Sequence, residues 1–222
     1  MISGGKIKTL KLFDLTHTAA GDYLGRFGYP WQALEGLGEF ILNLGATLGG
    51  DYYSPSEGVW VHKSATVAPT ACINAPAIVG EGTEIRHCAF IRGSALIGKN
   101  CVVGNSTEVK NSILFDGVQA PHYNYVGDSV LGYKSHLGAG AITSNVKSDK
   151  TTVFVAAEER IDTGLIKAGA FVGDFAEVGC NSVLNPGTVI GRNSSVYPLS
   201  SVRGVVPENS IYKNKNEIVL KV

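Results

Sequence analysis

Residues 61–115 read VHKSATVAPTACINAPAIVGEGTEIRHCAFIRGSALIGKNCVVGNSTEVKNSILF, and an apolar residue stands at every sixth position. These positions are Val61, Val67, Ile73, Val79, Ile85, Ile91, Ile97, Val103, Val109 and Phe115. A six-residue period matches neither a helix nor a single amphipathic strand, so it describes short strands joined by turns. The sequence therefore predicts a parallel β-solenoid, in which each repeat forms one side of a coil and its apolar residue points into a narrow core.

The repeat breaks and resumes along the chain. A second register starts near Leu131, and a third runs from Ile166 to Val202. Together the repeats are enough for about seven coils. One departure is the interval of sixteen residues from Phe115 to Leu131. The other is the charged stretch 144–165, which we expect to leave the coil as a protruding loop.

The segments on either side of the repeat predict a short helical cap and a simple tail. Residues 1–58 are too few for a nucleotide-binding sheet domain and hold no glycine-rich phosphate loop. Within them, Pro30 precedes apolar residues spaced by three or four, which predicts one helix over residues 31–46. The solenoid then covers 59–207, and the tail 208–222 is expected to add a strand or to pack on the last coil. The predicted fold class is all-β.

The overall composition argues against several classes of partner. Among 222 residues, 19 Lys and Arg balance 19 Asp and Glu, so the formal net charge is zero. Nucleic-acid and membrane-surface binding rely on an excess of basic side chains, so neither partner is expected. The sequence has no long apolar run and no signal-peptide pattern, which favours a cytoplasmic protein. Its four cysteines form no CxxC pair, and no closely spaced histidines suggest a metal site.

The first departure from the repeat carries a candidate catalytic group, His122. A histidine exchanges protons near neutral pH, so its imidazole can take a proton from an attacking amine or hydroxyl as a general base. The histidines His17, His62 and His87 lie in the cap segment or on regular coils, and we assign them no role. From the residues alone, His122 is either such a base or an uninvolved surface side chain.

A family resemblance rests on four blocks: FIRGSALIG (90–98), GNSTEVKNS (104–112), HYNYVGDSVLG (122–132) and HLGAGAITSN (136–145). In content and spacing they resemble the acetyltransferase half of the bifunctional N-acetylglucosamine-1-phosphate uridyltransferase/glucosamine-1-phosphate acetyltransferase family, including its archaeal sugar-1-phosphate relatives. The whole repeat resembles the wider hexapeptide-repeat family. That resemblance implies a single-stranded left-handed parallel β-helix, assembled as a homotrimer with sites between subunits.

The resemblance implies a role for each matching residue. They are the catalytic base His122; the sugar-phosphate ligands Arg92, Lys110, Tyr125, His136, Asn145 and Lys150; and Ala139 and Asp174 beside coenzyme A. Lys147 is the alternative to Lys150 as a loop lysine that reaches a neighbouring subunit's site. For Tyr125 the alternative is an inward ring that fills the coil. His136 and Asp174 differ from the family, which has an asparagine and a small residue at these positions.

The function that the resemblance implies is a CoA-dependent N-acetyltransferase acting on an amino-sugar phosphate such as glucosamine-1-phosphate. Acetyl-CoA would be the acyl donor, and backbone N–H groups would stabilise the oxyanion in a direct transfer. We expect no nucleotidyltransferase activity, because the sequence lacks that domain. The alternatives are an acyltransferase acting on another, nucleotide-linked amino sugar, and a non-catalytic regulatory partner of a separate sugar-phosphate nucleotidyltransferase.

Overall fold

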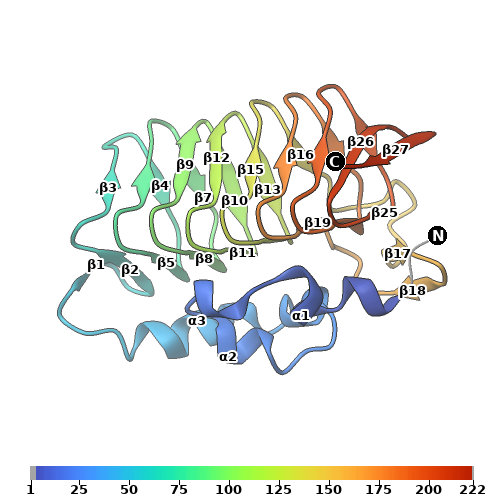
Figure 1. Ribbon diagram of the computed structural model, residues 1–222. Coiled ribbons are helices and arrows are strands. Elements are labelled where there is room, and N and C mark those ends of the chain that lie inside the picture. Colours follow the sequence, from blue (N-terminus) through green and yellow to red (C-terminus); the bar gives the residue numbers. More distant parts are fainter. Residues whose placement is uncertain (1–3, 222) are drawn as a thin grey trace.

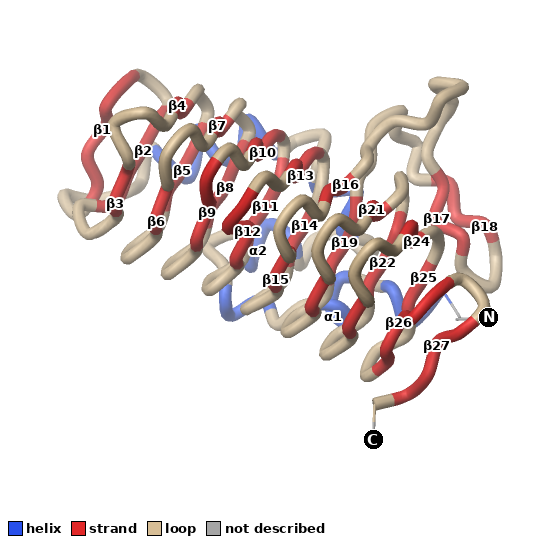
Figure 2. Tube along the Cα trace, turned by 90° about the horizontal axis from the view of Figure 1, so that it is seen from above, coloured by secondary structure: helices blue, strands red, loops and turns tan. Residues whose placement is uncertain are grey.

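Each coil of the chain contributes one short strand to each of three parallel sheets, which stack into a left-handed β-helix (Figures 1 and 2). The structure is a computed structural model that describes residues 4–221. We number the sheets 1, 2 and 3 in the order in which the chain visits them within a coil. The predicted all-β solenoid is confirmed.

The strands of the three sheets pair in parallel, except for β1 and β27, which are antiparallel to their neighbours. Sheet 1 consists of β1 (Tyr52–Ser56), β2 (Val59–His62), β5 (Ala77–Val79), β8 (Ala95–Ile97), β11 (Ser112–Leu114), β14 (Val130–Leu131), β19 (Ala170–Val172), β22 (Thr188–Ile190) and β25 (Val205–Val206). Sheet 2 consists of β3 (Thr66–Val67), β6 (Glu84–Ile85), β9 (Val102–Asn105), β12 (Gln119–His122), β15 (His136–Leu137), β20 (Glu177–Val178), β23 (Ser195–Val196), β26 (Ser210–Asn214) and β27 (Glu217–Leu220). Sheet 3 consists of β4 (Cys72–Ile73), β7 (Phe90–Ile91), β10 (Glu108–Lys110), β13 (Tyr125–Gly127), β16 (Ile142–Thr143), β21 (Val183–Leu184) and β24 (Ser201–Val202).

Columns of inward side chains account for the six-residue period. In sheet 1, Val79, Ile97 and Leu114 pair one after another through the parallel ladder, and all three are fully buried. Full burial of an aliphatic side chain of this size stabilises a fold by about 1.5–3 kcal/mol. Cys101 is also buried, and this burial raises the pKa of its thiol to about 12. Cys101 is therefore an inert core residue, as expected.

The interval between Phe115 and Leu131 is a regular coil, contrary to the prediction. Leu114, one residue before Phe115, pairs with Ile97 on the preceding coil and with Leu131 on the following one. Each of these steps is 17 residues, one fewer than the step of 18 that separates the paired Val79 and Ile97. A turn shortened by one residue thus looks, in the sequence, like a break in the repeat.

Three positions that the repeat assigned to the core point outward. Leu114 takes the inward place next to Phe115, whose ring lies 5.2 Å from that of Phe13 in the N-terminal segment. Val126 is fully buried, whereas Tyr125 before it is only partly buried. The Tyr125 ring therefore does not fill the coil. Ile166 is 55% exposed and precedes β19, so the third register begins at Val172 instead. The errors at Phe115 and Tyr125 arise because a period of six does not say which of two adjacent apolar residues faces inward. Ile166 instead still belongs to the inserted stretch, beside the bridge between Val146 and Lys167.

The N-terminal segment covers one side of the solenoid instead of capping its end (Figure 1). Its helical elements are η1 (Gly4–Ile7), α1 (Thr9–Leu12), η2 (Leu15–His17), α2 (Gly21–Leu24), η3 (Pro30–Ala33) and α3 (Leu37–Gly45). The predicted helix over residues 31–46 is thus split near Gly36. Beneath the segment, outward side chains of sheet 1 such as Leu96 and Phe171 are buried, and the Trp31 and Phe171 ring centroids lie 5.4 Å apart. No helix within residues 4–221 is long and apolar enough to cross a membrane.

A buried carboxylate, Asp174, fastens this segment to the solenoid. Its Oδ2 accepts the backbone N–H of Asp14 at 2.7 Å and lies 3.1 Å from the Arg192 guanidinium, while Oδ1 accepts the Tyr133 N–H at 2.9 Å. Burial raises the pKa of Asp174, and these partners oppose the rise. Because its side chain is 0% exposed, Asp174 does not face a cofactor. The expected contact with coenzyme A is therefore corrected to a structural role.

The stretch 144–165 protrudes only in its first part. Figure 2 shows the chain leaving β16 and returning to a hairpin near the last coils. This hairpin pairs β17 (Phe154–Ala156) with β18 (Arg160–Asp162) in antiparallel register. Val153 and Val155 are fully buried, and β17 lies against β22. The second part of the predicted loop is therefore packed on the solenoid.

The variant Asp174→Ala should lower the free energy of unfolding by about 2–4 kcal/mol, because two backbone donors and a guanidinium lose their acceptor. Urea denaturation measures the loss. Glu35→Ala removes an exposed carboxylate from the same N-terminal segment and should change stability by less than about 0.5 kcal/mol. Equal stability of the two variants would contradict the fastening role of Asp174.

Candidate functional site

Four predicted ligands converge on the outer face of sheet 3. The register pairs β7 with β10, β10 with β13 and β13 with β16, so these strands come from four successive coils. Neighbouring strands in a sheet lie about 4.8 Å apart, which brings outward side chains on adjacent coils within reach of one another. The converging residues, each on one of these strands or within two residues of its end, are Arg92, Lys110, Tyr125 and Asn145.

Asp128, a carboxylate that the sequence analysis did not single out, contacts two of these residues directly and a third through Asn145. It accepts hydrogen bonds from Lys110 Nζ at 3.1 Å, from Asn111 Nδ2 at 2.8 Å and from Asn145 Nδ2. Asn145 in turn bonds Tyr125. Only 4% of the Asp128 side chain is exposed, and a buried carboxylate requires such donors. Asp128 thus holds Lys110 and Asn145 at fixed positions.

The shortened turns between sheets 3 and 1 determine where Asp128 lies. From Val126 to Leu131 the inward positions are five residues apart instead of six, and Asp128 lies in the turn between them. Asn111 occupies the same place one coil earlier, and the two residues have φ values of 49° and 45°. Asn and Asp tolerate this left-handed conformation better than most residues. The irregular spacing was therefore a signal in the sequence for Asp128.

The Tyr125 ring lies back over Gly127 toward Asn145. A Cβ added at Gly127 would lie 2.5 Å from the Tyr125 hydroxyl oxygen, so this position has room for glycine alone. The hydroxyl accepts a hydrogen bond from Asn145 Nδ2 at 3.1 Å. Burial, followed by the charge of Asp128, raises the pKa of Tyr125. The phenol therefore keeps its proton at neutral pH and can donate a hydrogen bond to a bound anion.

The two cations of the group differ in how firmly each is neutralised. Lys110 pairs with the buried Asp128, whereas Arg92 pairs with Glu108 at 2.7 Å in a contact whose side chains are 45% and 31% exposed. Exposed ion pairs contribute only about 0–1 kcal/mol, so Arg92 can exchange Glu108 for another anion at little cost. If Lys110 left Asp128, the buried carboxylate would lose its charged partner, which is energetically costly.

His122 lies at the turn between sheets 2 and 3, next to this group. It ends β12, its side chain is exposed, and its carbonyl accepts the Gly140 N–H of the following coil at 3.0 Å. Its own N–H donates to Asn124 Oδ1 at 3.1 Å, and the Asn124 amide bonds two carbonyls of the following turn. The structure therefore stacks the turns of His122 and Ala139 directly on one another.

The other predicted residues lie apart from this group. His136 lies on the outer face of sheet 2, where its Nδ1 is 2.8 Å from Glu177 Oε2. Asp174 is under the N-terminal segment, as described above. In the loop, Lys147 Nζ is held by a carbonyl at 3.1 Å and by neighbouring side chains, whereas Lys150 is exposed and joins no ion pair within residues 4–221. The described residues include no group of three or more His, Cys, Asp or Glu side chains that could hold a metal ion.

Comparison with known proteins identifies the relationship. No family model matches the chain. Over 202 residues, which are 89% of this chain and 49% of the other, it is 31% identical to the bifunctional protein GlmU of Methanococcus maripaludis. The chain is therefore similar to about half of this GlmU protein. It is also 35% identical over 103 residues, 46% of this chain and 26% of the other, to the bifunctional sugar-1-phosphate nucleotidylyltransferase/acetyltransferase of Sulfurisphaera tokodaii.

These matches confirm the predicted resemblance. The chain spans about half the length of the GlmU relatives it matches, such as the 49% of the Methanococcus protein. Solved structures resemble it more distantly. The polySia-specific acetyltransferase NeuO superposes with a TM-score of 0.45 at 15% identity, over 75% of this chain and 88% of that one. A likeness at this level carries no weight for the chemistry of the present chain.

The two carboxylates of the group should differ sharply in their effect on stability. Asp128→Ala leaves Lys110 and two asparagine amides without their acceptor, and it is expected to lower the free energy of unfolding by about 2–4 kcal/mol. Glu108→Ala breaks only the exposed pair with Arg92 and should cost less than about 1 kcal/mol. Chemical denaturation of both variants provides the measurement, and a larger loss for Glu108→Ala would refute the assignment.

Proposed function

We propose that this chain transfers an acetyl group from acetyl-CoA to the amine of an amino-sugar phosphate such as glucosamine-1-phosphate. The observation that carries the proposal is the convergence of Arg92, Tyr125 and Asn145 on one face of sheet 3, with His122 at the adjoining turn. The relationship to the GlmU proteins supports an acetyl transfer, because the Sulfurisphaera relative is named as an acetyltransferase.

The sugar phosphate binds on the outer face of sheet 3. Arg92 releases the partly exposed Glu108 and takes the phosphate, for which the guanidinium fork is well suited. The Tyr125 phenol, kept protonated by its raised pKa, donates a further hydrogen bond. Lys110 stays on Asp128 and contributes its charge at a distance. Arg92 therefore carries more of the phosphate affinity than Lys110.

The transfer itself uses His122 and the turn below it. The amine nitrogen attacks the thioester carbonyl carbon, the new C–N bond forms, the C–S bond breaks and the sulfur leaves as the CoA thiol. His122 takes the proton that the amine loses, which favours attack at neutral pH. The Ala139 N–H meets no acceptor within residues 4–221 and donates to the developing oxyanion. No cysteine takes part in this transfer.

The general-base role predicts a selective loss in His122→Ala. Without the base, kcat should fall by about 10²–10⁴-fold, while the melting temperature stays unchanged because the side chain is exposed. Thiol release from acetyl-CoA in the presence of glucosamine-1-phosphate measures turnover. His87 occupies the corresponding turn two coils earlier, so His87→Ala is the matched control and should retain full activity.

The same assay separates the proposal from its alternatives. Turnover only with a nucleotide-linked amino sugar would replace the acceptor and keep the acetyl transfer. No turnover with glucosamine-1-phosphate, galactosamine-1-phosphate or their nucleotide-linked forms, and no heat of acetyl-CoA binding in calorimetry, would favour the non-catalytic regulatory partner. Unchanged turnover in His122→Ala would refute the base assignment alone.

The active assembly that we propose is a homotrimer whose sites lie between subunits. Lys150 supports this arrangement, because it stands exposed on the part of the loop that protrudes, whereas Lys147 is engaged within the loop. In the assembly, Lys150 of one subunit reaches the sugar phosphate beside His122 of the next. Lys150 is thus the preferred candidate of the two loop lysines.

Subunit mixing tests the shared site. His122→Ala and Lys150→Ala chains should each be nearly inactive alone, and co-expression should restore part of the activity, because some interfaces then combine an intact His122 with an intact Lys150. Light scattering follows the oligomeric state. Mixed trimers with no recovered turnover, or a fully active monomer, would contradict a site between subunits.

A further inference from the structure

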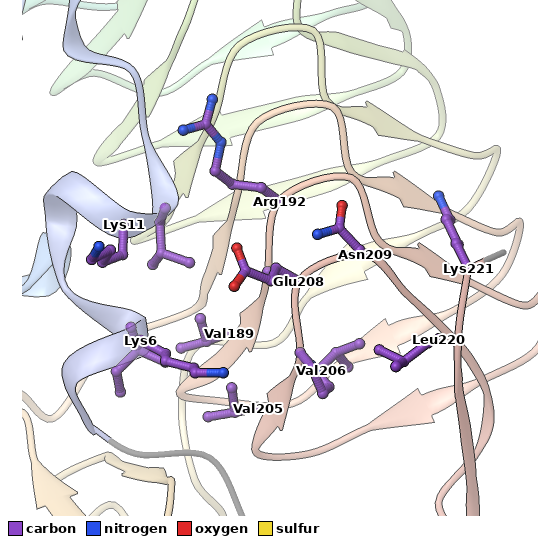
Figure 3. A pocket seen from close by; sticks show the side chains of 14 residues that line it. Lys6, Lys11, Val189, Arg192, Val205, Val206, Glu208, Asn209, Leu220 and Lys221 are labelled. Carbon is purple, nitrogen blue, oxygen red and sulfur yellow. The ribbon is translucent and has the colours of Figure 1, made fainter.

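A cavity of about 360 Å³ lies between the N-terminal segment and the last coils (Figure 3). One wall comes from η1 and α1, and the other from β22, β25, the turns that follow them and the end of β27. The cavity exists because the segment covers β22 fully but β25 only in part. Val189 on β22 is fully buried, whereas its register partner Val205 is half-buried.

The floor of this cavity is apolar. Val189 and Val205 lie there on sheet 1 (Figure 3). Ile7 and Leu12 line the cavity from the segment. Leu220, 72% exposed, borders it on the side of β27. Sites for small molecules are concave, mostly apolar, and typically upward of about 300 Å³. The cavity meets this description.

The rim of the cavity is positive. Lys6, Lys11 and Lys221 line it, and none of the three joins an ion pair within residues 4–221. Arg192 lines it as well, but its charge is balanced by Asp174 at 3.1 Å. Glu208 is the one acidic residue of the lining. Within residues 4–221, three lysines without an ion pair and one glutamate therefore line the cavity, so its surroundings carry a net positive charge and attract anions.

We infer that this cavity binds a small amphipathic anion, a carboxylate or phosphate ester joined to a short apolar chain or ring. The lysines select the charge, and burial of the apolar part against Val189 and Val205 supplies affinity. No residue of the lining belongs to the group on sheet 3, so this site is separate from that of the proposed acetyl transfer. The inference stands whether or not the chain is an acetyltransferase.

Calorimetry on the whole chain tests the chemistry of the ligand. Octanoate and octyl phosphate carry the two head groups on one chain, octylammonium reverses the charge, and acetate removes the chain. At least one of the two octyl anions should bind once per chain and at least tenfold more tightly than octylammonium and acetate. The tighter anion identifies the head group. Equal affinity for octylammonium, equal affinity for acetate, or no binding of either anion would overturn the inference.

Variants locate the binding in this cavity. Lys6→Glu/Lys11→Glu should weaken binding at least tenfold, because it reverses two charges of the rim. Lys8→Glu/Lys63→Glu makes the same charge change at exposed lysines outside the lining and should leave binding unchanged. Val205→Trp fills the floor and should also weaken binding at least tenfold. Melting temperatures confirm that each variant is folded, and undiminished affinity in either the charge-reversed or the filled variant would place the ligand elsewhere.

Discussion

The ladder of parallel hydrogen bonds between successive coils is the constraint on which the rest of this structure depends. Each strand pairs in register with strands one coil away, so residues 17 or 18 positions apart become neighbours, as Ile97 and Leu114 or Val79 and Ile97 do. Side chains at this constant sequence spacing therefore form columns that run along the solenoid. The same ladder that stacks the core brings Arg92, Tyr125 and Asn145 onto one face, although no two of them are close in sequence.

The candidate site combines a buried, fixed ion pair, Lys110–Asp128, with a partly exposed pair, Arg92–Glu108, whose anion can be exchanged. Asp128 is buried, takes donors from three side chains and cannot give up Lys110 cheaply. Glu108 is partly exposed and holds Arg92 by a contact that water already weakens. Two cations and two carboxylates make the group electrically balanced before any ligand arrives. An incoming phosphate therefore competes with Glu108 and leaves the buried pair in place.

Much of this architecture could be predicted from the sequence, because hexads at a strict period have few other physical explanations. The family resemblance located Arg92, Tyr125 and Asn145 for the same reason, since their blocks keep the spacing of the coils. The position of the N-terminal segment was missed. The clue was present in apolar triplets such as Ala77–Val79 and Ala95–Ile97, whose middle residue points outward and needs a cover. Asp128 and Asp174 were harder to interpret, because a turn aspartate looks the same whether its carboxylate faces solvent or three donors.

The N-terminal segment fixes the number of coils in the part of the solenoid that it spans. Its contacts fall at specific coils: α3 on β5 and β8, the His17 carbonyl on the Asp116 N–H, and Asp14 on Asp174. A stack held only by nearest neighbours could gain or lose a coil anywhere without local penalty. Here a whole coil inserted between the first and last of these contacts would shift one end of the segment from its partners. An added coil is therefore tolerated more easily beyond the last of these contacts than within the span that the segment covers.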